Sequence, residues 1–457
     1  MVDLAAIVKA YDVRGTVPDQ LDESVARAVG AAFVDVVGAT TVVTGHDMRA
    51  SGPALAAAFA EGATARGADV VELGLASTDL LYFASGMLGL PGAMFTASHN
   101  PARYNGIKLF RAHAVPVGQD TGLTAVRDAA QRYLDAAVPG ADELGTRTSR
   151  DLLAQYATYL RGLVDIRRIR PLTVVVDAGN GMGGLTAPAV LGDAVLPALP
   201  ITVVPLYFAL DGTFPNHEAN PLDPANLVDL QKAVLERGAD LGLAFDGDAD
   251  RCFVVGPDGS AVSPSTVTAL VAVRELARTP GATIIHNLIT SHAVPEVVRE
   301  HGGVPVRTRV GHSFIKARMA ETDAVFGGEH SAHYYFRDFW RADTGMLAAL
   351  HVLAALGAQD RPLTELVAPF VRYVDSGEIN STVAEPAARI AAVRAAFADR
   401  ATSTDDLDGL TVELPGAAWF NVRPSNTEPL LRLNVEAHDE ATMVAIRDEA
   451  LSVIRSG

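Results

Sequence analysis

The fold is decided in residues 241–251, LGLAFDGDADR, where a short apolar run gives way to alternating carboxylates. The run at 241–245 predicts a buried strand, because short apolar runs bounded by turn residues are typical of strands covered on both faces. The carboxylates of Asp246, Asp248 and Asp250 repel one another unless a cation gathers them, and the small residues between them let the loop fold around one. The stretch therefore predicts an oxygen-ligand site for Mg²⁺ where a strand ends.

Two other interpretations of this acidic stretch are weaker. An EF-hand counted from Asp246 would need glycine at its sixth position and glutamate at its twelfth, where this chain has Arg251 and Pro257. A solvated acidic turn explains neither the alternation nor the buried strand before it. Arg251 beside the carboxylates suggests that the metal shares its site with an anion such as a phosphoryl group.

The same alternation of strand and helix recurs along the chain, which predicts parallel strands with helices on both faces. Strands are expected at 40–45, 69–73, 93–96, 172–177, 201–206, 241–245, 283–287, 304–308 and 324–327. Helices are expected at 51–65, 78–87, 224–237, 291–300 and 313–321.

The last part of the chain has a different pattern, with a helix at 385–399, strands near 409–413, 417–422 and 430–436, and a closing helix. We therefore expect three related mixed α/β domains followed by a smaller C-terminal α+β domain. Their predicted ranges are 1–145, 146–254, 255–368 and 369–457.

Composition narrows the partners and the compartment. The 457 residues include 37 Lys and Arg against 54 Asp and Glu, a net charge of −17, which argues against nucleic acid and anionic membranes as partners. The single cysteine, Cys252, excludes an intrachain disulfide and is typical of a reducing cytoplasm. The N-terminus has no basic signal-peptide region, and the uncharged stretches 80–98 and 194–210 contain Gly or Pro that a membrane-spanning helix would hardly tolerate. We expect a cytoplasmic protein.

A serine follows one predicted strand in TASHNP, residues 96–101. Ser98 lies at the carboxyl end of that strand, where open α/β sheets bind ligands, and is a candidate nucleophile. No G-x-S-x-G elbow surrounds it, which argues against an α/β-hydrolase. His99 is its neighbour in sequence, and neighbouring side chains diverge at a strand end, so a simple Ser–His dyad is not expected. A plain turn is the alternative.

Two further loops carry hydrogen-bonding side chains. In FGGEHSAHYYF, residues 326–336, glycines precede Glu329, Ser331 and His333, a donor and acceptor set suited to sugar hydroxyls, although a loop leading into an aromatic strand is the alternative. In RPSNTEPLLR, residues 423–432, the side chains suit a phosphate ester, with a plain turn as the alternative. Nearby, His312 opens a helix, where it serves either an anion or a structural cap.

Gly179, Gly181 and Gly184 fit G-x-G-x-x-G directly after the strand at 172–177, as in a dinucleotide site. The acidic residue expected at the end of the next strand is missing. A tight connection from strand to helix explains these glycines better.

Five motifs in order resemble the signature set of the α-D-phosphohexomutase superfamily, and most closely its bacterial phosphomannomutase/phosphoglucomutase group. They are YDVRG (11–15), TASHNP (96–101), DGDADR (246–251), GEHSAH (328–333) and RPSNTEP (423–429). The resemblance covers the whole chain, with motifs in each expected domain. It implies four domains lining one central cleft.

The resemblance also implies roles for individual residues. Ser98 would be the phosphoserine and, with Asp246, Asp248 and Asp250, would hold Mg²⁺. Glu329 and Ser331 would contact sugar hydroxyls. The phosphate that is not reacting would be held by Arg423, Ser425, Asn426 and Thr427. Other matching positions are Tyr11, Arg14, His99, Lys108, Arg251, His312, His333 and Arg432, of which Lys108, Arg14 and His312 are candidates for proton handling or charge neutralisation.

The implied activity is interconversion of mannose 6-phosphate and mannose 1-phosphate through a phosphoserine and a hexose 1,6-bisphosphate, with glucose phosphates as second substrates. The lysine that dual-specificity relatives often carry is absent from residues 286–291, and His330 and Ala332 depart from the usual sugar loop. Phosphoglucomutase and phosphoglucosamine mutase are the alternatives within the superfamily, although Asn426 argues against the latter. Alternatives of another class are a non-catalytic sugar-phosphate-binding protein and a dinucleotide-dependent enzyme. We expect a monomer or homodimer, with the excess acid on its outer surface and the basic motif residues facing one cleft.

Overall fold

The computed structural model describes residues 3–8, 11–425 and 430–456. The chain divides into two compact units: Met1–Val267 with Ser331–Leu366, and Thr268–His330 with Val367–Gly457. Each unit contains two of the sheets or parts of them, and each is described by itself below.

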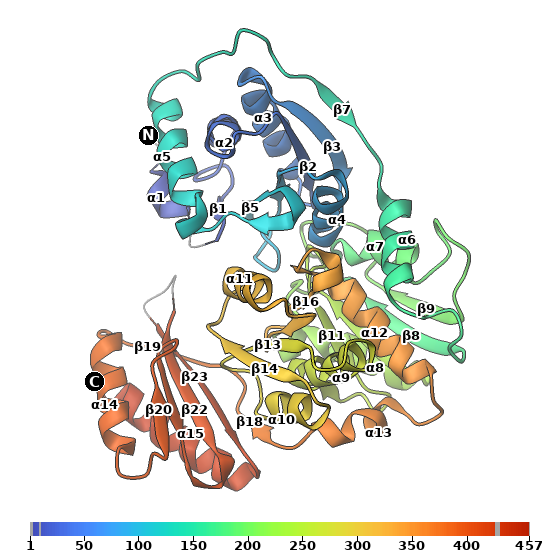
Figure 1. Ribbon diagram of the computed structural model, residues 1–457, viewed down its shortest axis with the longest axis vertical. Coiled ribbons are helices and arrows are strands. Elements are labelled where there is room, and N and C mark those ends of the chain that lie inside the picture. The colour runs from blue at the N-terminus through green and yellow to red at the C-terminus, as the bar shows by residue number, and fades with distance from the viewer. Residues whose placement is uncertain (1–2, 9–10, 426–429, 457) are drawn as a thin grey trace. The chain divides into compact units, whose positions relative to one another are not determined.

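The first sheet of the first unit has a parallel centre and antiparallel strands at one edge (Figure 1). Its order is β1-β5-β4-β2-β3-β7, in which β4, β2, β3 and β7 run parallel to one another, β5 is antiparallel to β4, and β1 is antiparallel to β5. The strands are β1 (Val13–Thr16), β2 (Thr41–His46), β3 (Asp69–Leu75), β4 (Gly92–Phe95), β5 (Tyr104–Arg111) and β7 (Arg147–Ser149), with β6 (Val115–Pro116) paired to β5. The helices are α1 (Leu4–Ile7), α2 (Glu23–Val37), α3 (Gly52–Ala65), α4 (Thr78–Leu88) and α5 (Leu123–Asp135).

The strand order of this sheet predicts at which edge a ligand binds. Strand β2 lies between β3 and β4, so the connections after β2 and β4 leave the sheet at a topological switch point. Open α/β sheets bind ligands in the crevice at such a point, outside the carboxyl ends of the strands. The loop at 96–101 follows β4 at this edge.

The second sheet of this unit repeats the plan, in the order β12-β11-β10-β8-β9. Strands β8 (Leu172–Asp177), β9 (Ile201–Leu206) and β10 (Leu241–Phe245) are parallel, whereas β11 (Cys252–Val255) is antiparallel to β10 and β12 (Ala261–Val262) is antiparallel to β11. Its helices are α6 (Leu153–Leu163), α7 (Gly183–Val190) and α8 (Val228–Arg237). The unit also contains β16 (Tyr334–Phe336), β17 (Ala342–Asp343) and α12 (Gly345–Gly357), and the helices α9 (Pro264–Arg278) and α13 (Leu363–Val367) begin in it.

The second unit holds a parallel group and an antiparallel sheet. Strand β13 (Thr283–Asn287) lies between β14 (Val304–Thr308) and β15 (Phe326–Gly328), with α10 (Ala293–Glu300) and α11 (His312–Thr322). The antiparallel sheet consists of β18 (Val374–Asp375), β19 (Ile379–Thr382), β20 (Ser403–Asp405), β21 (Leu410–Glu413), β22 (Trp419–Pro424) and β23 (Leu430–Ala437). Helices α14 (Pro386–Phe397) and α15 (Glu440–Arg455) contribute Val393, Phe397 and Ile446 to the core on this sheet.

These elements confirm the expected fold class of α/β domains followed by a smaller C-terminal domain. Strands β8, β9, β10, β13 and β14 have the predicted bounds. The prediction of parallel pairing holds for the sheet centres only, because β5 and β11 turn back along their neighbours as antiparallel strands. The four domain ranges stay a prediction.

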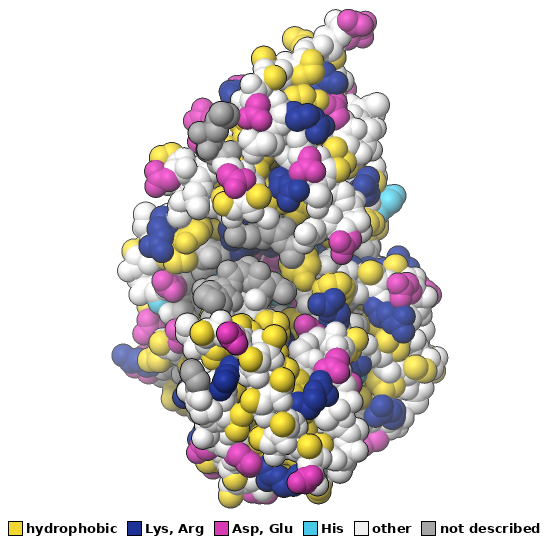
Figure 2. All heavy atoms as spheres, turned by 90° about the vertical axis from the view of Figure 1, so that its left-hand side faces the viewer, with side chains coloured by type: hydrophobic (Ala, Val, Ile, Leu, Met, Phe, Trp, Pro, Cys, Tyr) yellow, Lys and Arg dark blue, Asp and Glu magenta, His cyan; other side chains and the backbone are white. Residues whose placement is uncertain are grey.

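Two surface properties bear on partners. Among the described residues, no helix combines the length and apolar character needed to cross a bilayer. Side chains of both charge signs are interspersed over the face in Figure 2, and neither sign forms a broad patch there.

His286 is an unusually buried titratable group in β13. Its side chain lies in the second unit, with Nδ1 3.2 Å from the Asn287 carbonyl oxygen. Burial lowers the pKa of His286 to about 4, whereas an unfolded histidine has a pKa of about 6.5. A histidine whose pKa is lowered by folding stabilises the fold above the unfolded pKa, and this contribution is lost as the pH falls toward the folded pKa.

We therefore predict that lowering the pH from about 7 to about 5 removes about 2 kcal/mol of unfolding free energy through His286. His286→Asn should remove that part of the pH dependence, which urea unfolding at the two pH values measures. The exposed His113, changed to Asn, is the control. An equal loss in wild type and His286→Asn would contradict the assignment.

Candidate active site

Ser98 contacts the loop of residues 246–250, which we call the metal loop, although the two segments follow strands of different sheets. The Ser98 backbone has a φ of 49°, a left-handed conformation that serine seldom adopts. Its N–H donates to Thr96 Oγ1 at 2.9 Å, and its Oγ donates to Asp246 Oδ2 at 2.7 Å. A Cβ at Gly247 would lie 2.4 Å from the Ser98 carbonyl oxygen, so only glycine permits this close approach.

Arg49 binds the backbone of the Ser98 loop through hydrogen bonds. The sequence analysis did not identify this residue. Its guanidinium donates to the carbonyl oxygens of Ser98 (2.8 Å), Asn100 (2.6 Å), Pro101 (2.9 Å) and Tyr104 (2.9 Å). The residue is only 2% exposed, and its Nε donates to Asp47 Oδ2 at 3.2 Å. Because one rigid fork satisfies four carbonyls, it stabilises the left-handed backbone at Ser98.

The three aspartates of the metal loop are fully buried and lie within ligand distance of one another. One carboxylate oxygen from each of Asp246, Asp248 and Asp250 falls within 4.8 Å of the others. Among the described residues, Oδ1 of Asp248 and Oδ1 of Asp250 have no hydrogen-bond partner. Buried anionic oxygens without donors are costly unless a cation binds them, so this set fits an oxygen-ligand divalent metal.

Two basic side chains offset part of this negative charge. Lys108 Nζ, from β5, lies 2.7 Å from both Asp248 Oδ2 and Asp250 Oδ2, and Arg251 Nε lies 2.8 Å from Asp246 Oδ2. Burial would lower the pKa of Lys108, but these two carboxylates hold it well above its usual value. Burial, with the like charges of Asp250 and Asp248, raises the pKa of Asp246 despite Arg251. Lys108 and Arg251 therefore stay charged in this site.

His99 is neutral and positions Arg251 rather than Ser98. Its Nδ1 accepts a hydrogen bond from Arg251 Nη2 at 2.6 Å and lies 3.4 Å from Ser98 Oγ. Burial and the charges of Arg251 and Arg14 lower the pKa of His99 well below its usual value. With Nδ1 occupied by the guanidinium, His99 does not form the base of a Ser–His dyad, in line with the sequence analysis.

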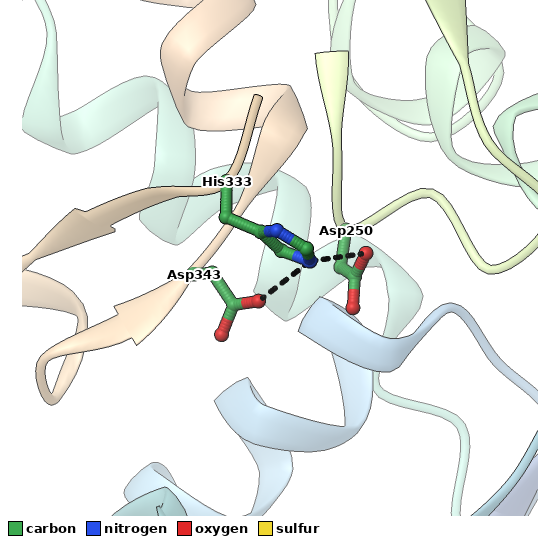
Figure 3. Close-up of side chains that lie close together, drawn as sticks. All are labelled: Asp250, His333 and Asp343. Atoms are coloured by element: carbon green, nitrogen blue, oxygen red, sulfur yellow. Dashed lines mark ion pairs between the residues drawn. The ribbon is translucent and has the colours of Figure 1, made fainter. Parts of the chain in front are cut away.

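A second group of ligand-type side chains shares Asp250. His333 Nε2 lies 3.6 Å from Asp250 Oδ1 and 3.8 Å from Asp343 Oδ2, as Figure 3 shows. On its other side, His333 Nδ1 lies 3.2 Å from Ser331 Oγ. A backbone bridge between His333 and Arg251 fixes this segment beside the metal loop. Ser331 and His333 thus belong to the same site as Ser98.

Arg14, on β1, approaches the Ser98 loop from the sheet edge. Its Nη1 donates to Asn100 Oδ1 at 2.6 Å, and its guanidinium pairs with Asp12. Its side chain is 23% exposed, so the surrounding residues do not enclose it completely. Tyr11, nearby in the chain, is half-buried.

In the second unit, Glu329 is held in a polar network. Its Oε1 accepts from Asn287 Nδ2 at 3.1 Å and from the Gly311 N–H at 3.2 Å, and the residue is only 2% exposed. His312, the first residue of α11, follows Gly311 directly. Three loops that follow the strands β13, β14 and β15 therefore meet at Glu329.

The predicted phosphate-binding residues flank a carboxylate that sequence analysis missed. Arg423 and Arg432 are opposite each other on β22 and β23. Glu378 joins them, with Oε2 2.6 Å from Arg423 Nη2 and Oε1 2.7 Å from Arg432 Nη1. Ser425 N–H bonds to the Leu430 carbonyl. Asn426 and Thr427 lie outside the described residues.

The glycines at 179, 181 and 184 serve backbone packing. Gly179 has a φ of 52°, and a Cβ at Gly181 would lie 2.7 Å from the Gly247 carbonyl oxygen. A Cβ at Gly184 would lie 2.2 Å from the Phe208 carbonyl oxygen. These contacts favour the tight connection over a dinucleotide site.

The predicted site residues therefore fall into two groups. The first unit holds Tyr11, Arg14, Ser98, His99, Lys108, Asp246, Asp248, Asp250, Arg251, Ser331 and His333. The second unit holds His312, Glu329, Arg423, Ser425 and Arg432. Convergence of both groups on one cleft stays a prediction.

Comparisons with known proteins match nearly the whole length of the chain. Family models described as phosphoglucomutase/phosphomannomutase domains I, II, III and the C-terminal domain match residues 5–135, 154–259, 263–373 and 378–453. The chain is 42% identical to a phosphomannomutase of Salmonella typhimurium, over 97% of each chain. It is 41% identical to a protein of Xanthomonas campestris named "Phosphohexose mutases", over 98% of this chain and 99% of the relative.

A solved structure gives the same result. A phosphoglucomutase/phosphomannomutase family protein of Burkholderia thailandensis matches with a TM-score of 0.88 and 34% identity, covering 100% of this chain and 99% of that one. Four domain models in order, full-length relatives and a matching structure agree with the family resemblance that the motifs indicate. The chain is a member of the phosphoglucomutase/phosphomannomutase family.

Proposed function

We propose that this chain interconverts mannose 6-phosphate and mannose 1-phosphate, through a phosphorylated Ser98 and a hexose 1,6-bisphosphate, and that it accepts glucose phosphates as second substrates. The observation that supports this most is the 2.7 Å hydrogen bond from Ser98 Oγ to Asp246 Oδ2. Asp246 is one of three neighbouring buried aspartates, and Arg251 also lies beside Ser98. Mannose is favoured over glucose because several full-length relatives near 40% identity are named phosphomannomutases.

The reaction proceeds by two opposite transfers. In the first, the P–O bond at Ser98 breaks, a P–O bond forms to the free hydroxyl of the sugar phosphate, and that hydroxyl loses its proton while Ser98 Oγ regains one. The resulting bisphosphate turns over, and the second transfer returns its other phosphoryl group to Ser98. Net chemistry is an isomerisation, so no phosphate is consumed.

The side chains of the first unit suit the reacting centre. Asp246, Asp248 and Asp250 would hold Mg²⁺, which supplies charge neutralisation at the phosphoryl oxygens when bound. Arg251 Nη2, 3.4 Å from Ser98 Oγ, neutralises negative charge on the group carried by that oxygen. Lys108 keeps its proton, since its pKa is well above the usual value, and acts through its charge rather than as a base.

The side chains of the second unit suit the parts of the substrate that do not react. Glu329 accepts hydrogen bonds and is preoriented by Asn287 and Gly311, as a group that reads sugar hydroxyls requires. Arg423 and Arg432 offer two guanidinium groups side by side for the waiting phosphate. Both arginines have a buried Nε without a hydrogen-bond partner among the described residues.

The substrate is tested by a coupled assay with mannose 1-phosphate, glucose 1-phosphate and an N-acetylglucosamine phosphate, each with catalytic hexose 1,6-bisphosphate. We expect the highest kcat/KM with mannose 1-phosphate and measurable turnover of glucose 1-phosphate. Preference for the amino sugar would reassign the substrate. No turnover of any of the three by folded protein would contradict the mutase proposal and favour a sugar-phosphate-binding protein.

Ser98→Ala should lower kcat by on the order of 10³-fold or more, because it removes the proposed phosphoryl carrier. Intact mass of the peptide containing Ser98 should reveal one phosphoryl group in wild type and none in the variant. Ser260→Ala is a matched control, since it also breaks a serine–aspartate hydrogen bond (2.6 Å to Asp258) but on an exposed turn. Retained activity in Ser98→Ala would exclude Ser98 as the carrier.

Asp248→Asn should raise the Mg²⁺ concentration for half-maximal activity by about tenfold or more, because a neutral amide replaces one anionic ligand. A Mg²⁺ titration after treatment with a chelator measures the shift. Asp240→Asn is the control: Asp240 is ion-paired to Arg170 at 2.8 Å but lies before β10, at the end opposite the metal loop. An unchanged Mg²⁺ response in Asp248→Asn would count against the metal loop.

A further inference from the structure

A buried carboxylate outside the motif residues gathers hydroxyl groups from three distant parts of the first unit. Asp79 is fully buried and accepts hydrogen bonds from Ser77 Oγ, from Tyr156 OH at 2.6 Å and from Thr344 Oγ1 at 2.7 Å. These donors lie before α4, in α6 and before α12. A carboxylate with three hydroxyl donors is satisfied without any cationic partner.

Two of these donors are the N-caps of helices. Ser77 Oγ accepts from the Leu80 N–H of α4, and Thr344 Oγ1 accepts from the Leu347 N–H of α12, each at 3.2 Å. Each hydroxyl therefore accepts a hydrogen bond from its own helix and donates one to Asp79. The N-terminal ends of both helices, which favour negative charge, are tied to one carboxylate.

The tied end of α4 contacts the metal loop directly. Thr78, between the cap and Asp79, donates its N–H to the Asp248 carbonyl oxygen at 3.0 Å. Its hydroxyl donates to Asp248 Oδ2 at 2.6 Å. This bond leaves Oδ1 of Asp248 as the carboxylate oxygen without a hydrogen-bond partner among the described residues. Thr78 thus orients the carboxylate that the proposed metal would bind.

The tied end of α12 contacts the residues that directly follow the metal loop. A Cβ at Gly345, the first residue of α12, would lie 2.5 Å from the carbonyl carbon of Arg251 and 2.9 Å from the Cys252 nitrogen. Backbones approach this closely only at glycine. The metal loop therefore lies between two helix N-termini, with Asp248 against α4 and Arg251 against α12.

We propose that Asp79 is a positioning residue that clamps these two helix N-termini on the metal loop and thereby sets the orientation of Asp248 for the divalent cation. The inference rests on the proposed function, because it assigns the cation to this loop. Burial raises the pKa of Asp79 to about 6, against the opposing effect of its three hydroxyl donors. The carboxylate is ionised above that pH and then needs all three donors.

The test measures binding of Mg²⁺, or of Mn²⁺ as a spectroscopic substitute, by calorimetry without any sugar phosphate. Asp79→Asn should weaken metal binding by about tenfold, the effect typical of groups that orient metal ligands. Thr78→Val should weaken it to a similar degree, and Tyr156→Phe, which removes one donor, by less. The double variant Asp79→Asn with Thr78→Val should bind no more weakly than the worse single variant, because both changes interrupt the same contact.

Ser85→Ala is the matched control, because it removes another buried hydroxyl of α4, bonded to the Leu90 carbonyl at 2.7 Å, at the end away from the loop. It should lower thermal stability like the other variants and leave metal affinity unchanged. If Asp79→Asn and Tyr156→Phe lose stability but bind metal within twofold of wild type, Asp79 is only structural and the proposal is wrong. If Asp79→Asn does not fold, Tyr156→Phe and Thr78→Val decide by the same criterion. Wild type that binds the cation but turns over no hexose phosphate would instead contradict the proposed function alone.

Discussion

The mutual repulsion of three buried carboxylates is the constraint on which the first unit depends. Asp246, Asp248 and Asp250 cannot lie together in a dry loop unless positive charge is brought to them. Part of it comes from Arg251 in the loop, and part from Lys108 on β5 of the other sheet. Compensation therefore requires the two sheets to associate, and the same association carries Ser98 to the loop. Formation of the candidate site therefore requires the two sheets to pack against each other.

Sequence patterns identified the buried parallel strands with their bounds and the predicted helices to within a few residues, but they left other elements out. Strands β8, β9 and β10 were predicted with their bounds because runs of branched apolar residues between turns have few other interpretations. Helix α12 was missed because all thirteen of its residues are buried, so no polar face gives it a helical period. Strand β5 was missed because Asn105, Gly106 and Lys108 interrupt its apolar pattern.

The side chains that meet in the candidate site were predictable from the sequence, whereas the residues that hold them in place were not. A motif such as DGDADR can be recognised because several charged side chains lie close together in the sequence. Arg49 binds carbonyl oxygens, which every residue has, so its partners leave no mark in the sequence. The donors to Asp79 are separated from it by 2, 77 and 265 residues. The only signals were a lone arginine after the strand predicted at 40–45 and a lone aspartate in the first turn of the helix predicted at 78–87.

The carboxylate between Arg423 and Arg432 has a consequence for how firmly the enzyme holds its ligand. Glu378 already occupies one nitrogen of each guanidinium, so the phosphate proposed to bind here would have to compete with a carboxylate of the protein itself. Such an internal competitor lowers the net affinity for phosphate while keeping both arginines ordered. In the proposed cycle the bisphosphate leaves this position, reverses and returns, and weaker net binding would favour that step because tight binding would trap the intermediate.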